Sequence, residues 1–336
     1  MTFTDSQIEL AHGSGGKATR RLIEGLIAPS LGVDTLMDAA SLSLGGAELA
    51  FTADSFVVHP LRFAGGSIGD LAINGTVNDL AVSGAKPIAL TCCAILEAGL
   101  PTETLRLVLD DVRKAAELAG VSIVGGDTKV VEHGKADGLY LSTAGIGLRD
   151  PRLNLDPAHV KAGDVVLLSG PIADHGITIL LTRGELDMEA DDLQSDSRSV
   201  YPYTAALTDA AHAGLRWMRD PTRGGLASAL NELARDAGVM VQLREADIPV
   251  RPEVRGACEV LGLDPLHVAN EGQFVAIVAP ELAEAGLAAI RALAGGEEAC
   301  LIGVIKDGPP VLTCLTPYGS ERVVDMLVGD PLPRIC

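Results

Sequence analysis

Hydrophobic and polar positions along the chain predict alternating strands and helices joined by glycine-rich turns. The segment LAFTADSFVV (49–58) has β-branched and aromatic residues around one aspartate, which is typical of a strand. The segment 65–87 begins with two glycines and continues with apolar residues at helical spacing. The clearest helix is expected over 101–120, with Thr102 as its N-cap and Gly120 as its stop.

The second half of the chain repeats this alternation. The apolar runs DVVLLSG (164–170) and FVAIVAP (274–280) predict strands. The segment RGGLASALNELARDAG (223–238) predicts a helix that begins at its glycines. Strands followed by helices in both halves indicate a chain with mixed α and β structure.

A change in pattern predicts where the chain divides. Residues 149–164 carry several Asp, Asn and Pro residues and little periodicity, as expected of a linker. We therefore expect one domain over 1–155 and a second over 156–329. Two prolines near the end favour a flexible, extended tail over 330–336 rather than a docked helix.

Composition narrows the class of protein. The 336 residues are 47% hydrophobic but only 3% aromatic, so the core must consist of Ala, Val, Leu and Ile. A net charge of −19, from 26 basic and 45 acidic residues, argues against a nucleic-acid or anionic-membrane partner. No run of about 18 to 20 apolar residues suits a membrane span, and MTFTDSQIEL lacks the features of a signal peptide. Six cysteines without a C-x-x-C pair fit a cytoplasmic protein without a zinc site.

Four carboxylates stand where a solvated surface residue is not expected. Asp79 lies on the helix face that carries the apolar residues, and Asp54 interrupts a strand pattern. Asp127 sits in the glycine loop GGDTK, and Asp220 precedes the helix start PTRGG. Several carboxylates around phosphates predict an oxygen-ligand Mg²⁺ site. A buried side chain that only caps a neighbouring loop is an equally good interpretation of Asp79 alone.

Other candidate residues are ambiguous by themselves. HGSGGK (12–17) departs from the Walker A pattern and is read more simply as a flexible loop. Lys129 lies two residues after Asp127, so in an extended segment both side chains face the same side. The pair is typical either of a nucleotide site or of a surface ion pair. Glu271 in ANEGQF resembles a solvated turn residue.

The order of these motifs is specific. HGSGGK, GGSIGDLAINGTVNDLAVSGAKP, GGDTKVV, SGPIADHG, DPTRGG, NEG and the terminal PRIC occur in this order over the whole chain. The set resembles the HypE family of hydrogenase-maturation carbamoyl dehydratases, in a superfamily similar to the aminoimidazole-ribonucleotide synthetases. The resemblance implies an α+β, two-domain fold in which the N-terminal domains of two chains pair into a β-barrel, giving a homodimer.

The resemblance also implies a site. ATP and Mg²⁺ would bind in the cleft between the domains and along the dimer groove. The residues that match metal positions of the family are Asp54, Asp79, Asp127 and Asp220. The matched motifs add further candidate ATP-binding residues, namely His12, Gly13, Gly125, Gly126, Thr128 and Arg223. Lys129 and Glu271 would act beside Cys336, the residue that matches the carbamoyl acceptor.

The implied reaction gives the terminal cysteine a role. The carbamoyltransferase HypF would load a carboxamide onto Cys336, and ATP-dependent dehydration would convert it to a thiocyanate. The cyanide would then pass to the iron held by the HypC–HypD pair for [NiFe] hydrogenase. Two alternatives remain open: a selenide or thiamine-phosphate kinase of the same superfamily, and a thiol carrier without catalysis. HGSGGK lacks the reactive Cys or selenocysteine of the selenide enzymes.

Overall fold

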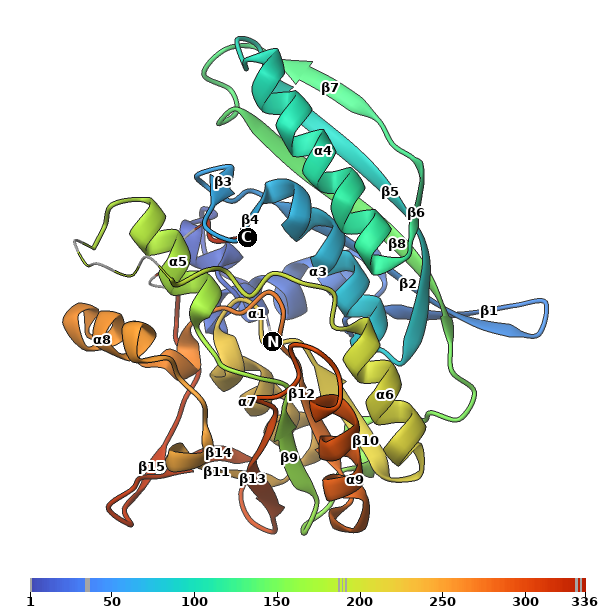
Figure 1. Cartoon of the computed structure of the whole chain (residues 1–336), viewed down its shortest axis with the longest axis vertical. Helices are drawn as coiled ribbons and strands as arrows, with labels where there is room; N and C mark the ends of the chain where they lie inside the picture. The colour runs from blue at the N-terminus through green and yellow to red at the C-terminus, as the bar shows by residue number, and fades with distance from the viewer. Residues whose placement is uncertain are drawn as a thin grey trace.

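The computed structural model describes residues 2–33, 37–186, 188, 190, 192–329, 332 and 334–336. Two mixed sheets with their helices lie one above the other, and the C-terminus lies beside the short β3–β4 hairpin (Figure 1). None of the described helices has the length and hydropathy that crossing a membrane requires.

The first sheet has the strand order β1-β2-β8-β5-β6, with β7 also pairing with β5. Its strands are β1 (Ala40–Leu44), β2 (Ala47–Phe56), β5 (Ala85–Glu97), β6 (Ser122–Gly125), β7 (Thr128–Val131) and β8 (Leu139–Arg149). The hairpin consists of β3 (Arg62–Phe63) and β4 (Gly66–Ser67). Over the described residues this sheet is open, so a barrel would require a second sheet.

The second sheet has the strand order β10-β12-β9-β13-β11-β14-β15. Its strands are β9 (Val165–Leu168), β10 (Leu215–Arg219), β11 (Met240–Arg244), β12 (Val275–Val278), β13 (Cys300–Lys306), β14 (Val311–Leu315) and β15 (Glu321–Val323). Helix α7 shares one core with this sheet, and α6 and α9 share another on the opposite face.

The structure describes nine α-helices, and the two longest, α3 and α4, pack on one side of the first sheet. The nine helices are α1 (Lys17–Leu22), α2 (Ala28–Leu31), α3 (Ile68–Val82), α4 (Thr102–Ala119), α5 (Asp174–Thr182), α6 (Tyr201–Ala211), α7 (Gly225–Ala237), α8 (Pro252–Leu261) and α9 (Pro280–Arg291). Helix α3 lies on the sheet and α4 packs against α3 (Figure 1). Thirteen residues of α3 are buried, so nearly its whole circumference faces protein.

The predicted elements of both halves are present. The predicted strands correspond to β2, β9 and β12, and the predicted helices to α3, α4 and α7. The expected cap of α4 is wrong by one residue, because Pro101 occupies the N-cap position and Thr102 is already helical. Gly120 ends α4 in the left-handed conformation, as expected.

The face of the first sheet opposite α3 carries large apolar side chains that no other described part of the chain covers. Strand register places Leu42, Phe51, Leu148 and Ile95 on this face, because their neighbours along each strand point toward α3. Each of the four is between 43% and 48% exposed. We call these four residues the uncovered face.

The chain passes from the first sheet to the second between Arg149 and Val165, an interval that contains the expected boundary at residue 155. The start of the chain lies against the end of the second domain. Lys17 N donates to Leu327 O at 2.9 Å, and Ala18 N donates to Val328 O at 3.2 Å. The N-terminal segment, although it precedes the first domain in the chain, therefore packs against the second.

Candidate active site

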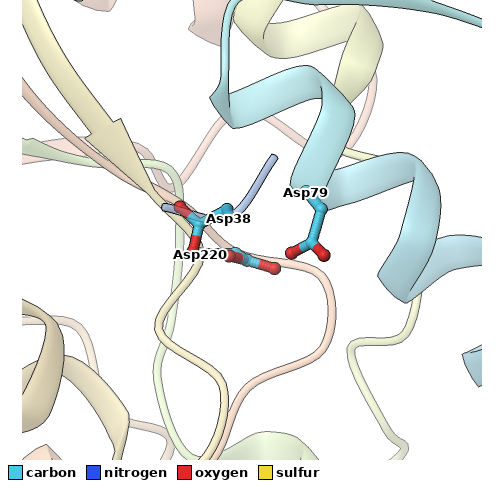
Figure 2. Close-up of side chains that lie close together, drawn as sticks. All are labelled: Asp38, Asp79 and Asp220. Atoms are coloured by element: carbon cyan, nitrogen blue, oxygen red, sulfur yellow. The ribbon is translucent and has the colours of Figure 1, made fainter. Parts of the chain in front are cut away.

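Three aspartates converge where the two domains meet. Asp79 comes from α3, Asp220 directly follows β10, and Asp38 precedes β1. Each offers a carboxylate oxygen, and these oxygens lie within 4.8 Å of one another. Figure 2 shows the three carboxylates gathered at one point. Sequence reasoning found Asp79 and Asp220 but missed Asp38, which has no periodic pattern around it to mark it as buried. We call these three residues the aspartate trio.

The trio carries more negative charge than its surroundings balance. Burial, and then the charges of Asp220 and Asp38, raise the pKa of Asp79 well above its usual value. Burial and Asp38 raise the pKa of Asp220 to about 7. Burial also raises the pKa of Asp38, although Arg219 Nε lies 2.9 Å from its Oδ1. Such a group favours either bound protons or a bound cation.

The trio fits a divalent metal ion. Carboxylate oxygens are the ligands that Mg²⁺ and Ca²⁺ prefer, and none of the three residues offers a nitrogen or sulfur ligand. The Thr52 hydroxyl donates to Asp79 Oδ2 at 2.8 Å, which holds that carboxylate in place. Asp38, Asp79 and Asp220 are therefore the residues that would hold the metal.

We expect Mg²⁺ to raise the melting temperature more at about pH 8 than at about pH 5. Because the pKa of Asp220 in the folded chain is about 7, its contribution to stability is complete below the usual Asp pKa and is lost as the pH rises through about 7. Mg²⁺ neutralises the ionised trio, so it restores the most stability at the pH where ionisation has removed the most. Thermal melts with and without Mg²⁺ check this; equal shifts at both pH values would contradict it.

Two further predicted carboxylates lie near the trio. Asp54 reaches α3, since its Oδ2 lies 3.9 Å from the position that a Cβ on Gly75 would occupy. Glu271 is 4% exposed, and its Oε1 has no hydrogen-bond partner among the described residues. Burial, followed by the charges of Asp196, Asp220 and Asp54, raises the pKa of Glu271 well above its usual value. The expectation of a solvated turn residue is therefore wrong for Glu271.

A cavity of about 740 Å³ adjoins the trio. Its lining includes Asp38, Asp220 and Arg223, with Gly15 and Gly16 from the N-terminal loop. This volume lies within the range of small-molecule and cofactor sites. The cavity lies between the domains, where the family resemblance of the sequence motifs leads us to expect ATP.

The N-terminal loop meets the DPTRGG loop at this cavity. Arg223 Nη1 donates to Gly13 O at 2.9 Å. Gly15 has φ +78°, and a Cβ there would lie 2.7 Å from Arg223 Cβ, so the close approach requires glycine. His12 is turned into its own loop, where its Nδ1 accepts from Glu9 N and its Nε2 lies 2.9 Å from Asp5 Oδ2. Gly13 and Arg223 thus come together, while both His12 ring nitrogens have partners inside the loop.

The glycine loop GGDTK lies elsewhere in the chain. Gly125, Gly126, Asp127 and Thr128 form the junction of β6 and β7, at the far side of β5 from β2. Strand register puts this junction about three strand spacings, roughly 14 Å, from Asp54. Within one chain, the structure does not bring this loop to the trio.

Asp127 and Lys129 form the pair expected from their spacing. Lys129 Nζ lies 2.5 Å from Asp127 Oδ2, and both side chains are mostly exposed. Lys129 is opposite Ile95 in the register, so the pair lies on the uncovered face, whereas Asp54 and Asp79 lie on the α3 side. The predicted metal residue Asp127 is therefore separated from the other three by the sheet itself.

The described part of the tail is docked against the body of the protein. Val57 N, directly after β2, donates to Cys336 O at 3.1 Å. Ile335 is 1% exposed, and Leu332 is 3% exposed. The tail was expected to be flexible and extended; in this structure its described residues make specific contacts close to the strand that carries Asp54.

Comparisons with known proteins cover the whole chain. Residues 36–149 match the family AIR synthase related protein, N-terminal domain, and residues 161–313 match its C-terminal domain. A protein of Azotobacter vinelandii named carbamoyl dehydratase HypE is 48% identical over 340 residues, which span 100% of this chain and 99% of that protein.

Two solved structures are similar in fold and in sequence. One is hydrogenase maturation protein HypE in complex with ATP, with TM-score 0.83 and 42% identity over 98% of this chain and 100% of that one. The other is a HypE–HypF complex, with TM-score 0.86 and 39% identity over 91% of this chain and 99% of that one. Since both domains match and the identity to a named relative extends over the full length, the chain belongs to the HypE family of carbamoyl dehydratases, within the AIR synthase related proteins.

Proposed function

We propose that this chain uses ATP to dehydrate an S-carboxamide on Cys336 to a thiocyanate, the source of the cyanide ligand for the iron of [NiFe] hydrogenase. One observation carries the proposal. The chain's own terminal cysteine is docked at the end of β2, the strand that also carries Asp54 beside the aspartate trio. The substrate thiol and the acidic cluster are thus linked through one strand, β2, whose Thr52 contacts Asp79 and whose end lies beside Cys336.

The proposed reaction is balanced as follows. The Cys336 sulfur carries the carboxamide, and the oxygen of this group attacks the γ-phosphorus of ATP. The bond from the γ-phosphorus to the bridging oxygen of ADP breaks, and a phosphorylated intermediate forms. Loss of the amide protons and departure of phosphate then leave a carbon–nitrogen triple bond on sulfur. The net change is R–S–C(O)NH₂ plus ATP to R–S–CN plus ADP and phosphate.

The residues divide this work. Asp38, Asp79 and Asp220 would hold Mg²⁺, which offsets negative charge on the phosphates when bound. Glu271 would take an amide proton, because its raised pKa makes the ionised carboxylate a stronger base than an exposed glutamate. Lys129 would balance charge on the transferred phosphoryl group.

Lys129 and Asp127 can serve this site from a second chain. Within one chain they lie on the uncovered face, on the other side of the sheet from Asp79. The same face leaves Leu42, Phe51, Ile95 and Leu148 partly exposed, and a second copy of the sheet would cover them. We therefore propose a homodimer whose N-terminal sheets pair into a barrel and complete the ATP site between chains.

We expect a dimer by light scattering at low micromolar concentration. Phe51→Asp should weaken it, because the substitution places a charge in the centre of the proposed apolar contact. Leu118→Asp, at a residue of α4 that is 89% exposed and away from this face, is the control and should leave the mass unchanged. A monomer in the unmodified protein would contradict the proposal.

Subunit mixing tests whether the site is shared. Asp79→Asn and Asp127→Asn chains should each be inactive as homodimers. In a mixed dimer, one of the two sites receives both native aspartates, so random pairing should restore about a quarter of the sites. No recovery in purified mixed dimers would show that both residues serve a site within a single chain.

ATP turnover separates an enzyme from a passive thiol carrier. We expect phosphate release only after Cys336 carries the carboxamide, because the attacking oxygen belongs to that group. The HypF-type transferase, with carbamoyl phosphate and ATP, would provide the loaded chain, and the HypC–HypD pair would accept the product. Equal phosphate release by loaded and unloaded chains would contradict this mechanism, and no release by the loaded chain would favour the carrier.

A further inference from the structure

The tail is held mainly through its own backbone. His59 N donates to Arg334 O at 3.2 Å, and Val57 N donates to Cys336 O at 3.1 Å, so the last residues run alongside the segment after β2. Arg183, just after α5, donates to Arg334 O and also to His59 O. None of these contacts uses the Cys336 sulfur.

The side chain of Ile335 adds an apolar anchor. Ile335 is 1% exposed and belongs to the core cluster that includes Phe56, Val58 and Ile177. Arg334 instead points to the surface, where its Nη1 lies 2.7 Å from Asp137 Oδ2. Arg334 has a left-handed backbone, with φ +57°, and the chain turns there so that Ile335 enters the core.

Among the described residues, only His175 contacts the third tail carbonyl, that of Ile335. Its Nε2 lies 2.6 Å from Ile335 O, which can only accept, so Nε2 carries the proton. Its Nδ1 lies 2.8 Å from Ser195 Oγ and accepts from that hydroxyl. Burial lowers the pKa of His175 to about 4, so the ring is neutral at physiological pH. The two partners fix one tautomer, and the Phe63 ring packs nearly perpendicular to the His175 ring at a centroid distance of 5.5 Å.

We propose that Val57, His59, Arg183 and His175 form a receptor for the C-terminal tail. In this receptor, His175 is the positioning residue that fixes the register of the tail. A one-residue shift of the tail would bring Arg334 or Cys336 to the Ile335 pocket and move the Ile335 carbonyl away from Nε2. The receptor contacts the backbone carbonyls of Arg334, Ile335 and Cys336 and buries the side chain of Ile335.

The receptor is connected to the predicted base. Ser195 is bonded to His175, and the next residue, Asp196, accepts from Glu271 N at 3.0 Å and from Gly272 N at 3.2 Å. One short segment therefore contacts the tail receptor at Ser195 and the Glu271 backbone at Asp196. The role of the receptor in catalysis rests on the function proposed above, but the docking itself does not.

Accessibility of Cys336 tests the receptor without ATP or partners. We expect His175→Ala to raise the rate of Cys336 alkylation by roughly ten-fold, measured by mass of the C-terminal peptide, because Ile335 O loses its donor. His175→Gln, whose side-chain NH₂ can replace Nε2–H, should stay near the unmodified rate. Ile335→Ser removes the apolar anchor of the tail and should also raise the rate, and a thermal melt of this variant checks that the body stays folded.

Two control variants complete the design. Arg183→Ala should raise the rate, while Arg106→Ala, whose side chain forms a surface pair with Glu103 on α4, should not. An unchanged rate in both His175→Ala and Ile335→Ser would overturn the proposal. So would a rate for His175→Gln as high as that for His175→Ala.

The two half-reactions supply a second readout. A tail with Ile335 buried must leave the receptor to enter a transferase site. His175→Ala should therefore accept the carboxamide at least as fast as the unmodified chain but dehydrate it roughly ten-fold more slowly. Equal slowing of both steps would indicate a general structural defect and overturn the positioning role. If neither chain dehydrates while alkylation responds as expected, the proposed function fails and the receptor stands.

Discussion

Replacing Asp79 by asparagine should weaken Mg-ATP binding by at least about 100-fold and leave the melting temperature unchanged or higher. The substitution removes one of three carboxylates that would share the metal, and charge-assisted ligands of this kind are not replaced by a neutral amide. It also relieves the repulsion from Asp220 and Asp38 that raises the pKa of Asp79 in the metal-free chain. Affinity and stability should therefore respond in opposite ways.

Titration calorimetry and thermal melts on the same samples check this prediction. Asp70→Asn is the matched control, because Asp70 lies on the same helix, accepts from the Ser67 hydroxyl at 3.0 Å and is outside the trio. It should keep the affinity of the unmodified chain. If Asp79→Asn melts at a lower temperature while nucleotide affinity holds, Asp79 is a structural residue and the loop-cap interpretation is correct.

Cys336→Ala should abolish acceptance of the carboxamide while folding and ATP binding stay intact. The contacts of the tail with Val57, His59 and His175 go to its backbone carbonyls, so Cys336→Ala keeps these contacts. The chain then lacks the proposed acceptor, and two of the remaining thiols, Cys258 and Cys314, are buried. Burial raises the pKa of Cys258 and Cys314 to about 11, which keeps both protonated at neutral pH.

Substitution of a buried cysteine should have the reverse effect. Cys314 is 0% exposed, and Cys314→Ala should cost about 1 kcal/mol of folding free energy while acceptance at Cys336 is retained. Label from carbamoyl phosphate counted on the two variants distinguishes them. Label on the Cys336→Ala chain, or on any other cysteine of the unmodified chain, would contradict the assignment.

Local pattern was enough to predict the elements but not their environment. Strand β2 and helix α4 follow from periodicity and end residues that act within a few positions. Helical spacing places Asp79 on an apolar face, but α3 is buried almost all round, so that face does not distinguish it from the others. A carboxylate anywhere on such a helix needs a partner, and this requirement holds whichever direction Asp79 points.

The parts that could not be predicted depend on contacts between distant segments. Asp38 joins the trio only because the residues before β1 lie beside β10, where Arg219 pairs with it. The separation of Asp127 from Asp79 is set by the strand order, which places β8 between β2 and β5. The docked tail depends on His175, which lies 160 positions from its partner Ile335. No local pattern carries information of this kind.

The mass of the C-terminal peptide tests the central claim most directly. After incubation with the transferase, carbamoyl phosphate and Mg-ATP, the peptide that ends in Cys336 should first gain about 43 Da and then lose about 18 Da as the carboxamide is dehydrated. Replacing ATP in the second step by a non-hydrolysable analogue should stop the peptide at the first mass. A peptide that never gains the first increment, or that keeps it indefinitely in the presence of Mg-ATP, would contradict the account.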